Sequence, residues 1–266
     1  MTTKGRLIVV GTGMNVGQMT AEAREWLMRA DDVVYAVPDE ATEQLIKTLS
    51  PKAESLFGFY DHGKPRAQTY TQMVERTLAG VRAGRTVCAA FYGHPGVFVY
   101  PSHAAIRIAR REGHEARMLP GISATDCLFA DLGIDPARGI QEYEATDLLL
   151  SRRPIDPMGR LILWQVGLIG DFTYRPEGKP SNQPVLAEYL AAFYPADHPI
   201  FIYEADTEPG ARPRIEKITV AGVATAKFSL ATTLYVPPLR QPDLDKAMVE
   251  RLGLAQSAVD EVLNLE

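Results

Sequence analysis

Two tyrosines and an arginine stand close together in residues 59–73, which read FYDHGKPRAQTYTQM. Tyr60, Arg66 and Tyr70 share this segment with one histidine and no cysteine, so the set is neither a metal site nor a hydrolase triad. A phenol ordinarily has a pKa near ~10 and is a weak base unless a neighbouring cation favours its ionised form. Arg66 can supply that charge without losing its own proton. The residue types therefore fit proton transfer beside a fixed cation.

The same residues also have an ordinary structural interpretation. Tyr60 and Tyr70 can be half-buried aromatic residues, with Arg66 a solvated helix residue, and spacing alone favours that interpretation. The pattern of residues 66–84 predicts an amphipathic helix, with Pro65 suited to its first turn and Gly84 to its end. Because Arg66 and Tyr70 are four residues apart, they share one helix face. Tyr60 lies just before the turn and can fold back towards them.

Two glycine-containing loops follow predicted strands. YGHPGVFVYPSH (92–103) and LPGISATDC (119–127) each come directly after a buried strand, at the sheet edge where open α/β sheets bind ligands. Gly93 and Gly96 allow close approach of a ligand, and Ser123 suits a helix N-cap. His94 can equally be a polar loop residue without function. The two loops together predict a shared pocket for a small molecule.

A third glycine motif is only weak evidence for a dinucleotide-binding site. GTGMNVG (11–17) has the spacing G-x-G-x-x-x-G rather than G-x-G-x-x-G, although Asp39 lies where a ribose-binding acid belongs. A tight glycine turn after the first strand is the better interpretation.

The elements around these loops alternate between strand and helix. Apolar runs at 6–11, 32–37, 86–93 and 115–119 predict strands, and 20–30, 39–49, 101–113 and 123–133 predict helices. This order is typical of an α/β fold with a largely parallel sheet. Periodicity is lost from 134 to 160, in the turn-rich GIDPARG and RRPIDPMG. The second half predicts strands at 160–166, 199–205, 214–220 and 230–238, with a helix near 185–194 and a more antiparallel sheet. We therefore expect an N-terminal α/β domain at 1–135, a smaller α/β domain at 136–238 and a helical tail at 239–266.

Bulk composition excludes several classes of protein. The 266 residues carry a net charge of −5, which argues against a partner gripped through nucleic-acid phosphates. No apolar run approaches the ~20 residues needed to span a membrane, and the N-terminus is not a signal peptide. Cys88 and Cys127 are too few for a disulfide scaffold or a CxxC metal site. We expect a cytoplasmic protein with no metal, no nucleic-acid partner and no membrane.

At this point GTGMNVGQMT, YGHPGVF and LPGISATDCLFADLGIDP, in this order, resemble the tetrapyrrole (corrin/porphyrin) methylase superfamily. Tetrapyrrole members usually carry Asp where His94 stands. YDHGKPRAQTYTQM, FYGHPGVFVYPSH, ARMLPGISATDCLFADL and LILWQVG are similar to one branch, the borosin peptide-backbone α-N-methyltransferases. The resemblance runs from about residue 6 to Pro238. It implies two α/β domains with S-adenosylmethionine (SAM) bound in the cleft between them.

The resemblance also implies roles for particular residues. Tyr60, Arg66 and Tyr70 would face a peptide amide, with Tyr92 close by. Residues from both domains would contact SAM: Tyr92, His94, Val97, Phe98, Ser123, Ala124, Gln165, Ala205, Thr232 and Thr233. Deprotonation by Tyr70, aided by Arg66, with Tyr60 or Tyr92 bonding the imidate oxygen, is our hypothesis, but the sequence leaves open which tyrosine is the base.

Two departures from the branch bear on substrate and partners. Phe57 stands where a family enzyme has another tyrosine, so a phenol there cannot be essential. Fused members continue into an arm and a substrate tail, whereas 28 residues follow Pro238 here and the sequence ends EVLNLE without a plausible core peptide. We therefore expect a separate precursor peptide, methylated in trans as in ribosomally made and modified borosin peptides. The resemblance implies an intertwined homodimer, which with the precursor would be a heterotetramer, and the tail could clasp the dimer or hold the precursor.

Other functions compete with this interpretation. The first is a SAM-dependent methyltransferase acting on a tetrapyrrole or another small acceptor, against which His94 and the Tyr60, Arg66 and Tyr70 set argue. The second is a non-catalytic SAM-binding subunit, and the third is a dehydrogenase. Release of SAM or S-adenosylhomocysteine on denaturation would favour methyl transfer, and release of NAD would favour the dehydrogenase.

Overall fold

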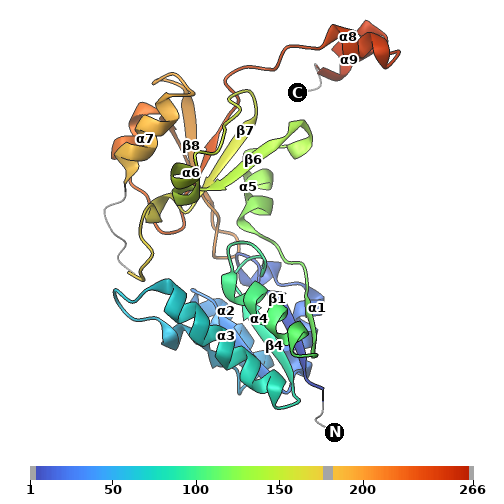
Figure 1. Cartoon of the computed structure of the whole chain (residues 1–266), viewed down its shortest axis with the longest axis vertical. Coiled ribbons are helices and arrows are strands. Elements are labelled where there is room, and N and C mark those ends of the chain that lie inside the picture. The colour runs from blue at the N-terminus through green and yellow to red at the C-terminus, as the bar shows by residue number, and fades with distance from the viewer. Residues whose placement is uncertain (1–3, 176–181, 264–266) are drawn as a thin grey trace.

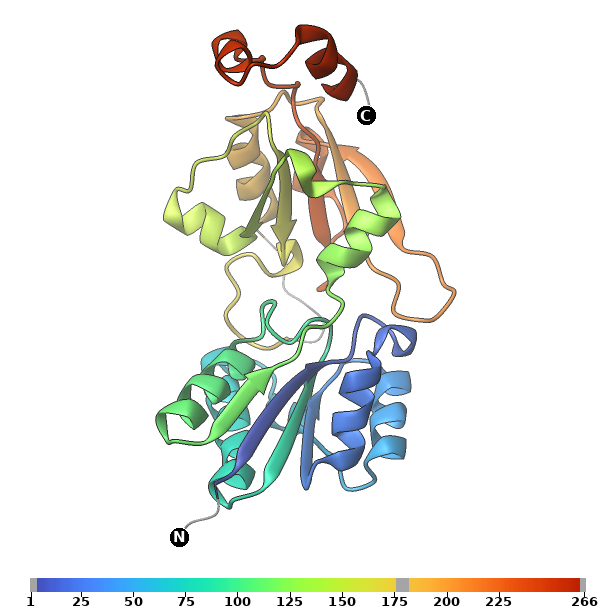
Figure 2. The ribbon, with the colours of Figure 1, turned by 90° about the vertical axis from the view of Figure 1, so that its right-hand side faces the viewer.

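Two five-stranded sheets, one in each half of the body, organise the molecule (Figure 1). The computed structural model describes residues 4–175 and 182–263 of the chain. The first half of the sequence builds the sheet nearer the N-terminus. The second half builds the other sheet, beyond which the C-terminal tail extends (Figure 2).

The first sheet is parallel throughout, in the order β3-β2-β4-β1-β5. Its strands are β1 (Arg6–Gly11), β2 (Asp32–Ala36), β3 (Glu54–Ser55), β4 (Thr86–Phe91) and β5 (Glu115–Met118). Successive residues of β1 point to opposite faces, so Leu7 and Val9 enter one core while Ile8 and Val10 enter another. Burial on both faces explains the uninterrupted apolar runs of β1 and β4.

Helices cover both faces of this sheet. α1 (Ala21–Arg29) and α2 (Glu40–Leu49) contribute Leu27 and Ile46 to the core on one side. α3 (Arg66–Arg82) and α4 (Tyr100–Arg111) contribute Leu78 and Ala109 to the core on the other. The predicted strands and helices of this half are confirmed, with their ends within two residues of the expected ones.

The second sheet is mixed, in the order β6-β7-β10-β8-β9. Its strands are β6 (Ile140–Glu144), β7 (Arg160–Trp164), β8 (Pro199–Glu204), β9 (Arg214–Thr219) and β10 (Thr233–Val236). Only the pairing of β6 with β7 is parallel among these strands, which confirms the expected antiparallel character.

Three helices pack against the second sheet. α6 (Ala145–Ser151) and α7 (Gln183–Ala191) bury Leu148 and Leu190 against one face. α5 (Ala124–Leu132) buries Leu128 against Trp164 and Tyr203 on the other face. α5 therefore lies within the range 1–135 that was expected for the first domain but packs on the sheet of the second half.

Two elements, β6 and α6, lie where the sequence predicts only turns. β6 is an edge strand with the sequence IQEYE, half-exposed along its length, so it lacks a continuous apolar run. α6 is only seven residues long, which is too short for a clear period. Short 3-10 helices complete the fold at Val16–Gln18, Leu56–Phe59, Pro136–Arg138, Val166–Leu168 and Ala221–Thr225.

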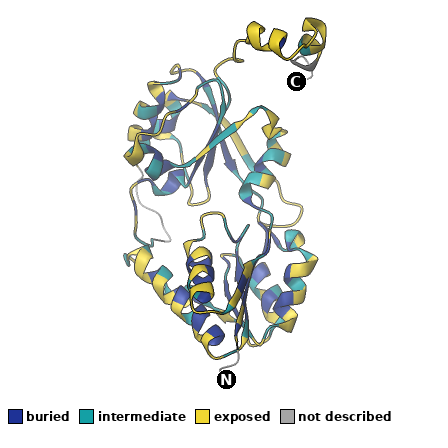
Figure 3. Ribbon diagram, turned by 45° about the vertical axis from the view of Figure 1, so that its right-hand side comes forward, coloured by how far each residue is buried: buried dark blue, intermediate teal, exposed yellow. Residues whose placement is uncertain are grey.

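The tail forms α8 (Lys246–Arg251) and α9 (Gln256–Leu263), which lie apart from the body of the protein. Most of its residues are exposed (Figure 3). These include the apolar side chains Leu244, Met248, Leu252 and Leu254. None of the helices in the described ranges is long and apolar enough to cross a bilayer.

Candidate active site

The residues just before α3 turn back onto that helix. The carbonyl of Phe59 accepts a hydrogen bond from Lys64 Nζ at 2.6 Å and from Thr69 Oγ1 at 3.3 Å. These bonds hold Tyr60 beside α3, as expected for a residue that folds back towards Arg66 and Tyr70. Tyr70 lies close enough to Tyr60 to raise the pKa of its phenol.

Two adjoining cavities collect the predicted catalytic residues. The larger, here the Arg66 cavity, has a volume of about 590 Å³ and is lined by Arg66, Tyr70 and Gln165 among others. The smaller, here the Tyr92 cavity, has a volume of about 350 Å³ and is lined by Tyr60, Tyr70 and Tyr92. Tyr70 and Gln165 line both cavities and so mark where they meet.

The Tyr92 cavity also takes side chains from the glycine–proline loop. Val97 and Phe98 line it, and both are exposed. Phe98 has a φ of 56°, in the left-handed region that favours glycine, and its ring lies 5.9 Å from that of Trp164. Gln165, directly after Trp164, has a φ of 57°. Strained residues of this kind concentrate at functional sites, and these two line the same cavity from the two halves of the molecule.

Burial keeps two of the phenols protonated. The pKa of Tyr60 is raised above its ordinary value by burial and by Tyr70, which outweigh the opposing charge of Arg66. The pKa of Tyr92 is raised to about 12 by burial and by the charges of Asp39, Cys127 and Asp206. Both hydroxyls therefore remain hydrogen-bond donors at neutral pH.

A short segment of the second half completes the Arg66 side of the site. Arg66 N donates to the carbonyl of Phe172 at 2.9 Å, and Arg66 Nη1 donates to the carbonyl of Asp171 at 3.2 Å. The ring of Tyr174 lies 4.4 Å from the ring of Tyr60. Sequence reasoning missed Asp171 and Tyr174, because they lie in an irregular segment that no helical or strand period places.

The remaining residues expected to contact a cofactor lie outside the linings of both cavities, within the described part of the chain. They are His94, Ser123, Ala124, Ala205, Thr232 and Thr233. His94 Nδ1 accepts from Gly96 N at 3.0 Å and so supports its own loop. Ser123 caps α5 in a reciprocal arrangement with Asp126, as expected for an N-cap.

A third cavity of about 430 Å³ adjoins this group. Asp126, Cys127 and Asp206 line it, each within three residues of an expected cofactor contact. Cys127 and Asp206 also raise the pKa of Tyr92, so this cavity lies near that phenol. The predicted site residues are thus distributed over more than one cavity.

The glycines of GTGMNVG act by packing. Gly13 N donates to Gly93 O at 3.3 Å, and Gly93 N donates to Gly13 O at 2.9 Å. A Cβ on Gly11 would lie 2.3 Å from Gly93 O. These contacts support the interpretation of GTGMNVG as a tight turn, since its glycines let the two loops at the sheet edge touch.

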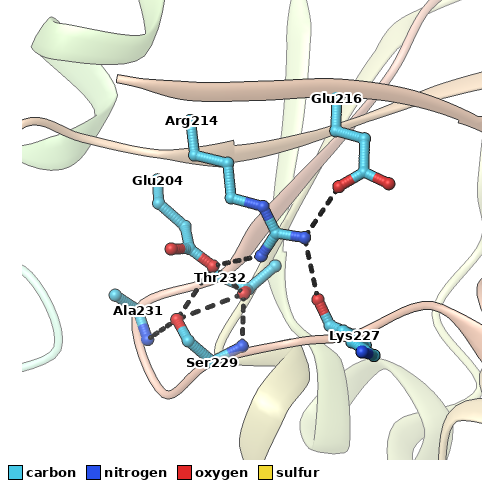
Figure 4. Close-up of polar contacts among 7 residues, drawn as sticks. All are labelled: Glu204, Arg214, Glu216, Lys227, Ser229, Ala231 and Thr232. Carbon is cyan, nitrogen blue, oxygen red and sulfur yellow. Dashed lines mark hydrogen bonds and ion pairs between the residues drawn. The ribbon is translucent and has the colours of Figure 1, made fainter. Parts of the chain in front are cut away.

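Glu204, at the end of β8, anchors the loop that carries Thr232 (Figure 4). Its Oε1 accepts hydrogen bonds from Thr232 Oγ1 at 2.5 Å, Ser229 Oγ at 2.8 Å and Arg214 Nη1 at 2.9 Å. Thr232 Oγ1 in turn accepts from Ser229 N at 2.8 Å. The Thr232 hydroxyl is therefore engaged inside the protein, so only its methyl or backbone could meet a ligand.

Among residues 4–175 and 182–263, no group of three or more His, Cys, Asp or Glu residues could hold a metal ion. Asp39 Oδ2 is buried and accepts no hydrogen bond from a described residue, although Oδ1 caps α2 through Thr42 N at 2.7 Å. An unpartnered anionic oxygen near Tyr92 suits a ligand that brings hydroxyl groups or positive charge.

Solved structures with this architecture include methyltransferases. Uroporphyrin-III-C-methyltransferase from Thermus thermophilus superposes with a TM-score of 0.62 over 96% of this chain and 99% of that chain, at 18% identity. The same enzyme complexed with S-adenyl homocysteine gives a TM-score of 0.59 over 88% of this chain and 93% of that chain, at 16% identity. At such identities the likeness shows the fold alone. The predicted two-part α/β methylase fold is confirmed.

Curated relatives are more similar in sequence. The chain is 43% identical over 258 residues to the methyltransferase/ribosomally synthesized cyclic peptide dendrothelin A precursor of Dendrothele bispora, covering 94% of this chain and 62% of that protein. It is 43% identical over 260 residues to the corresponding omphalotin A precursor of Omphalotus olearius, covering 95% and 62%. A type I borosin precursor of Coprinopsis marcescibilis is 40% identical over 265 residues, covering 95% and 68%. The chain thus spans less than two thirds of the first two relatives.

The family described as Tetrapyrrole (Corrin/Porphyrin) Methylases matches residues 6–221. The chain belongs to this family, and its curated relatives include borosin methyltransferase/precursor fusions.

Proposed function

We propose that this protein is a SAM-dependent methyltransferase that α-N-methylates backbone amides of a ribosomally made precursor peptide. The gathering of Tyr60, Arg66, Tyr70 and Tyr92 around two adjoining cavities supports this function. The relatives, whose names join a methyltransferase to a cyclic peptide precursor, support the peptide as acceptor.

An amide nitrogen needs activation before it can accept a methyl group. Its lone pair is delocalised into the carbonyl, by the same resonance that keeps the peptide planar. SAM, when bound, supplies an electrophilic methyl group on a sulfonium. The protein must therefore remove the N–H proton and stabilise the negative charge that develops on the carbonyl oxygen.

The three phenols divide these tasks. Tyr60 and Tyr92 have raised pKa values and keep their protons, so they are the donors to the imidate oxygen. One such donor is worth about 3–4 kcal/mol in related oxyanion sites. Tyr70 lines both cavities and shares a helix face with Arg66, so it is the proposed base. Holding the nitrogen in line would contribute further.

The site offers groups that fit SAM. Val97 and Phe98 would contact its apolar parts, Gln165 would bond a polar part, and Tyr92 lines the same cavity. Ser123, Ala124 and Ala205 would contact SAM from loops outside that lining. The unpartnered Asp39 oxygen would accept from a hydroxyl or an ammonium group. Thr232 and Thr233, which are buried, would shape the cofactor loop.

The precursor and the dimer are further parts of the proposal. The relatives join methyltransferase and precursor in one polypeptide, whereas we propose that this protein receives a separate precursor in trans. We also propose a homodimer in which the apolar residues of the tail are covered by a second copy, forming a heterotetramer with two precursors.

Mass spectrometry tests the proposal directly. Purified protein is incubated with SAM and with short proteins encoded near its gene, and fragmentation locates added methyl groups on backbone nitrogen. Methylation of the protein itself would overturn the proposal that a separate precursor is the substrate. Methylation of a porphyrinoid, with no peptide methylated, would favour the tetrapyrrole alternative. Release of bound SAM without any turnover would favour a non-catalytic SAM-binding subunit.

A further inference from the structure

The start of α3 is capped by the other half of the molecule. Pro65, which precedes the helix, makes no side-chain cap to the described residues, so the first N–H of the helix depends on another partner. That partner is the carbonyl of Phe172, which accepts from Arg66 N at 2.9 Å. Since Arg66 begins this helix, the cap fixes the backbone from which its guanidinium extends.

Residues 171–175 pair with residues 63–66 at more than one point. Gly63 N donates to Tyr174 O at 2.8 Å, and Tyr174 N donates to Lys64 O at 3.0 Å. Pro65 and Thr173 form an isolated β-bridge between these hydrogen bonds. We call this pairing the junction. It places the ring of Tyr174 against Tyr60 and the carbonyl of Asp171 against the Arg66 guanidinium.

The Asp171 side chain stabilises the turn in the 171–175 segment of the junction. It is 9% exposed, and its Oδ1 accepts from Thr173 N at 2.8 Å and from Thr173 Oγ1 at 2.7 Å. This is an Asx turn, in which an aspartate bonds the backbone two residues ahead. Oδ2 is buried, accepts no hydrogen bond from the described residues and lies 3.7 Å from Arg175 Nε.

We propose that Asp171 is a positioning residue for the amide-activating cluster. Its carboxylate holds the turn whose backbone caps α3, anchors Arg66 and seats Tyr174 against Tyr60. This role rests on the proposed function of the cluster. Asp171 acts through Arg66 and Tyr60, because its carboxylate fixes the backbone that bonds Arg66 and carries Tyr174.

Hydrogen exchange measures the junction without any turnover. In the full-length Asp171→Ala variant, we expect the amides of Gly63, Arg66 and Tyr174 to exchange about tenfold faster or more, with the strands of both sheets unchanged. Asp171→Asn keeps an oxygen acceptor for Thr173 and should recover most of the protection. Asp135→Ala is the matched control, because Asp135 Oδ1 bonds Ala137 N at 2.9 Å in the same kind of turn on the surface.

Turnover and SAM affinity supply the second measurement. We expect Asp171→Ala to lower kcat about tenfold or more while the Kd for SAM stays within about twofold, and Asp171→Asn to restore kcat. Unchanged exchange at the junction in Asp171→Ala, or fast exchange with wild-type kcat, would overturn the proposal. If Asp171→Ala does not fold, Thr173→Val can be used instead, because it removes one hydrogen-bond donor to the carboxylate. It should speed exchange of the same amides by a smaller factor. Absence of turnover in the wild type, with a protected junction, would count against the proposed function and not against the turn.

Discussion

At the residue scale, the three phenols occupy different places in the candidate site. Tyr60 and Tyr92 are held protonated by their surroundings, whereas Tyr70 lies at the meeting point of the two cavities on the same helix face as Arg66. The sequence could identify all three tyrosines as candidates but could not assign the base and the donors among them. The burial and the neighbouring charges that set their pKa values arise only when both halves of the chain are folded.

Replacing the proposed base should abolish most of the activity. We expect Tyr70→Phe to lower kcat about 100-fold or more, since general base catalysis contributes at least that factor. Arg66→Ala should have a loss of similar size. Tyr189→Phe is the control, because the Tyr189 hydroxyl bonds Arg153 O at 3.0 Å outside both cavities. Wild-type rates in Tyr70→Phe and Arg66→Ala would refute the assignment.

The phenol of Tyr92 should lose its proton at a higher pH than an ordinary tyrosine does. Because burial raises its pKa to about 12, it should keep its proton as pH rises past the ordinary tyrosine value near ~10 and lose it only near the raised value. The tyrosinate absorbance of Tyr92→Phe should therefore match the wild type through the ordinary range and fall short of it at the alkaline end. A difference already present in the ordinary range would contradict the donor role.

At the element scale, loops rather than helices decide how the site is assembled. Most strands and helices could be predicted, because their apolar periods are long and regular. β6 and α6 could not, since the strand lies at an edge and the helix is short. The junction could not be predicted either, because its hydrogen bonds join residues about 110 positions apart through irregular backbone.

Glu204 should matter for the cofactor rather than for the amide. Its carboxylate holds Thr232, Ser229 and Arg214 together, and hydrogen bonds to a charged group are about twice as strong as neutral ones. We expect Glu204→Gln to weaken SAM binding about tenfold in calorimetry. Glu216→Gln is the matched control, because Glu216 bonds the same Arg214 at 2.8 Å but is exposed. Equal affinities in the two variants would contradict this role.

At the scale of the whole molecule, residues from both halves line the cavities of the candidate site. No described residue of the tail lines any of these three cavities. The tail instead exposes apolar side chains on a segment tied to the body at few points, one being the bond from Leu239 N to Pro157 O at 2.7 Å. Contiguous apolar residues on a surface commonly mark an interface.

Charges on the tail should therefore separate the proposed dimer. We expect Met248→Glu combined with Leu252→Glu to convert a dimer to a monomer in light scattering, because each buries a carboxylate in an apolar contact. Met28→Glu, a similar change at an exposed methionine of α1, should leave the dimer intact. A wild-type protein that is monomeric at all concentrations would refute the dimer.

The cap on α3 has a consequence for how such proteins can be recombined. Because the Phe172 carbonyl caps the start of a helix that lies about a hundred residues earlier in the chain, we expect that the two halves cannot be exchanged independently between homologues. A chimera that joins one parent's residues 57–70 to another parent's residues 171–175 would bring together two surfaces that were never selected as a pair. Transferring both segments from one parent should preserve the hydrogen bonds between them. The two segments therefore have to be exchanged together, although they are distant in the sequence.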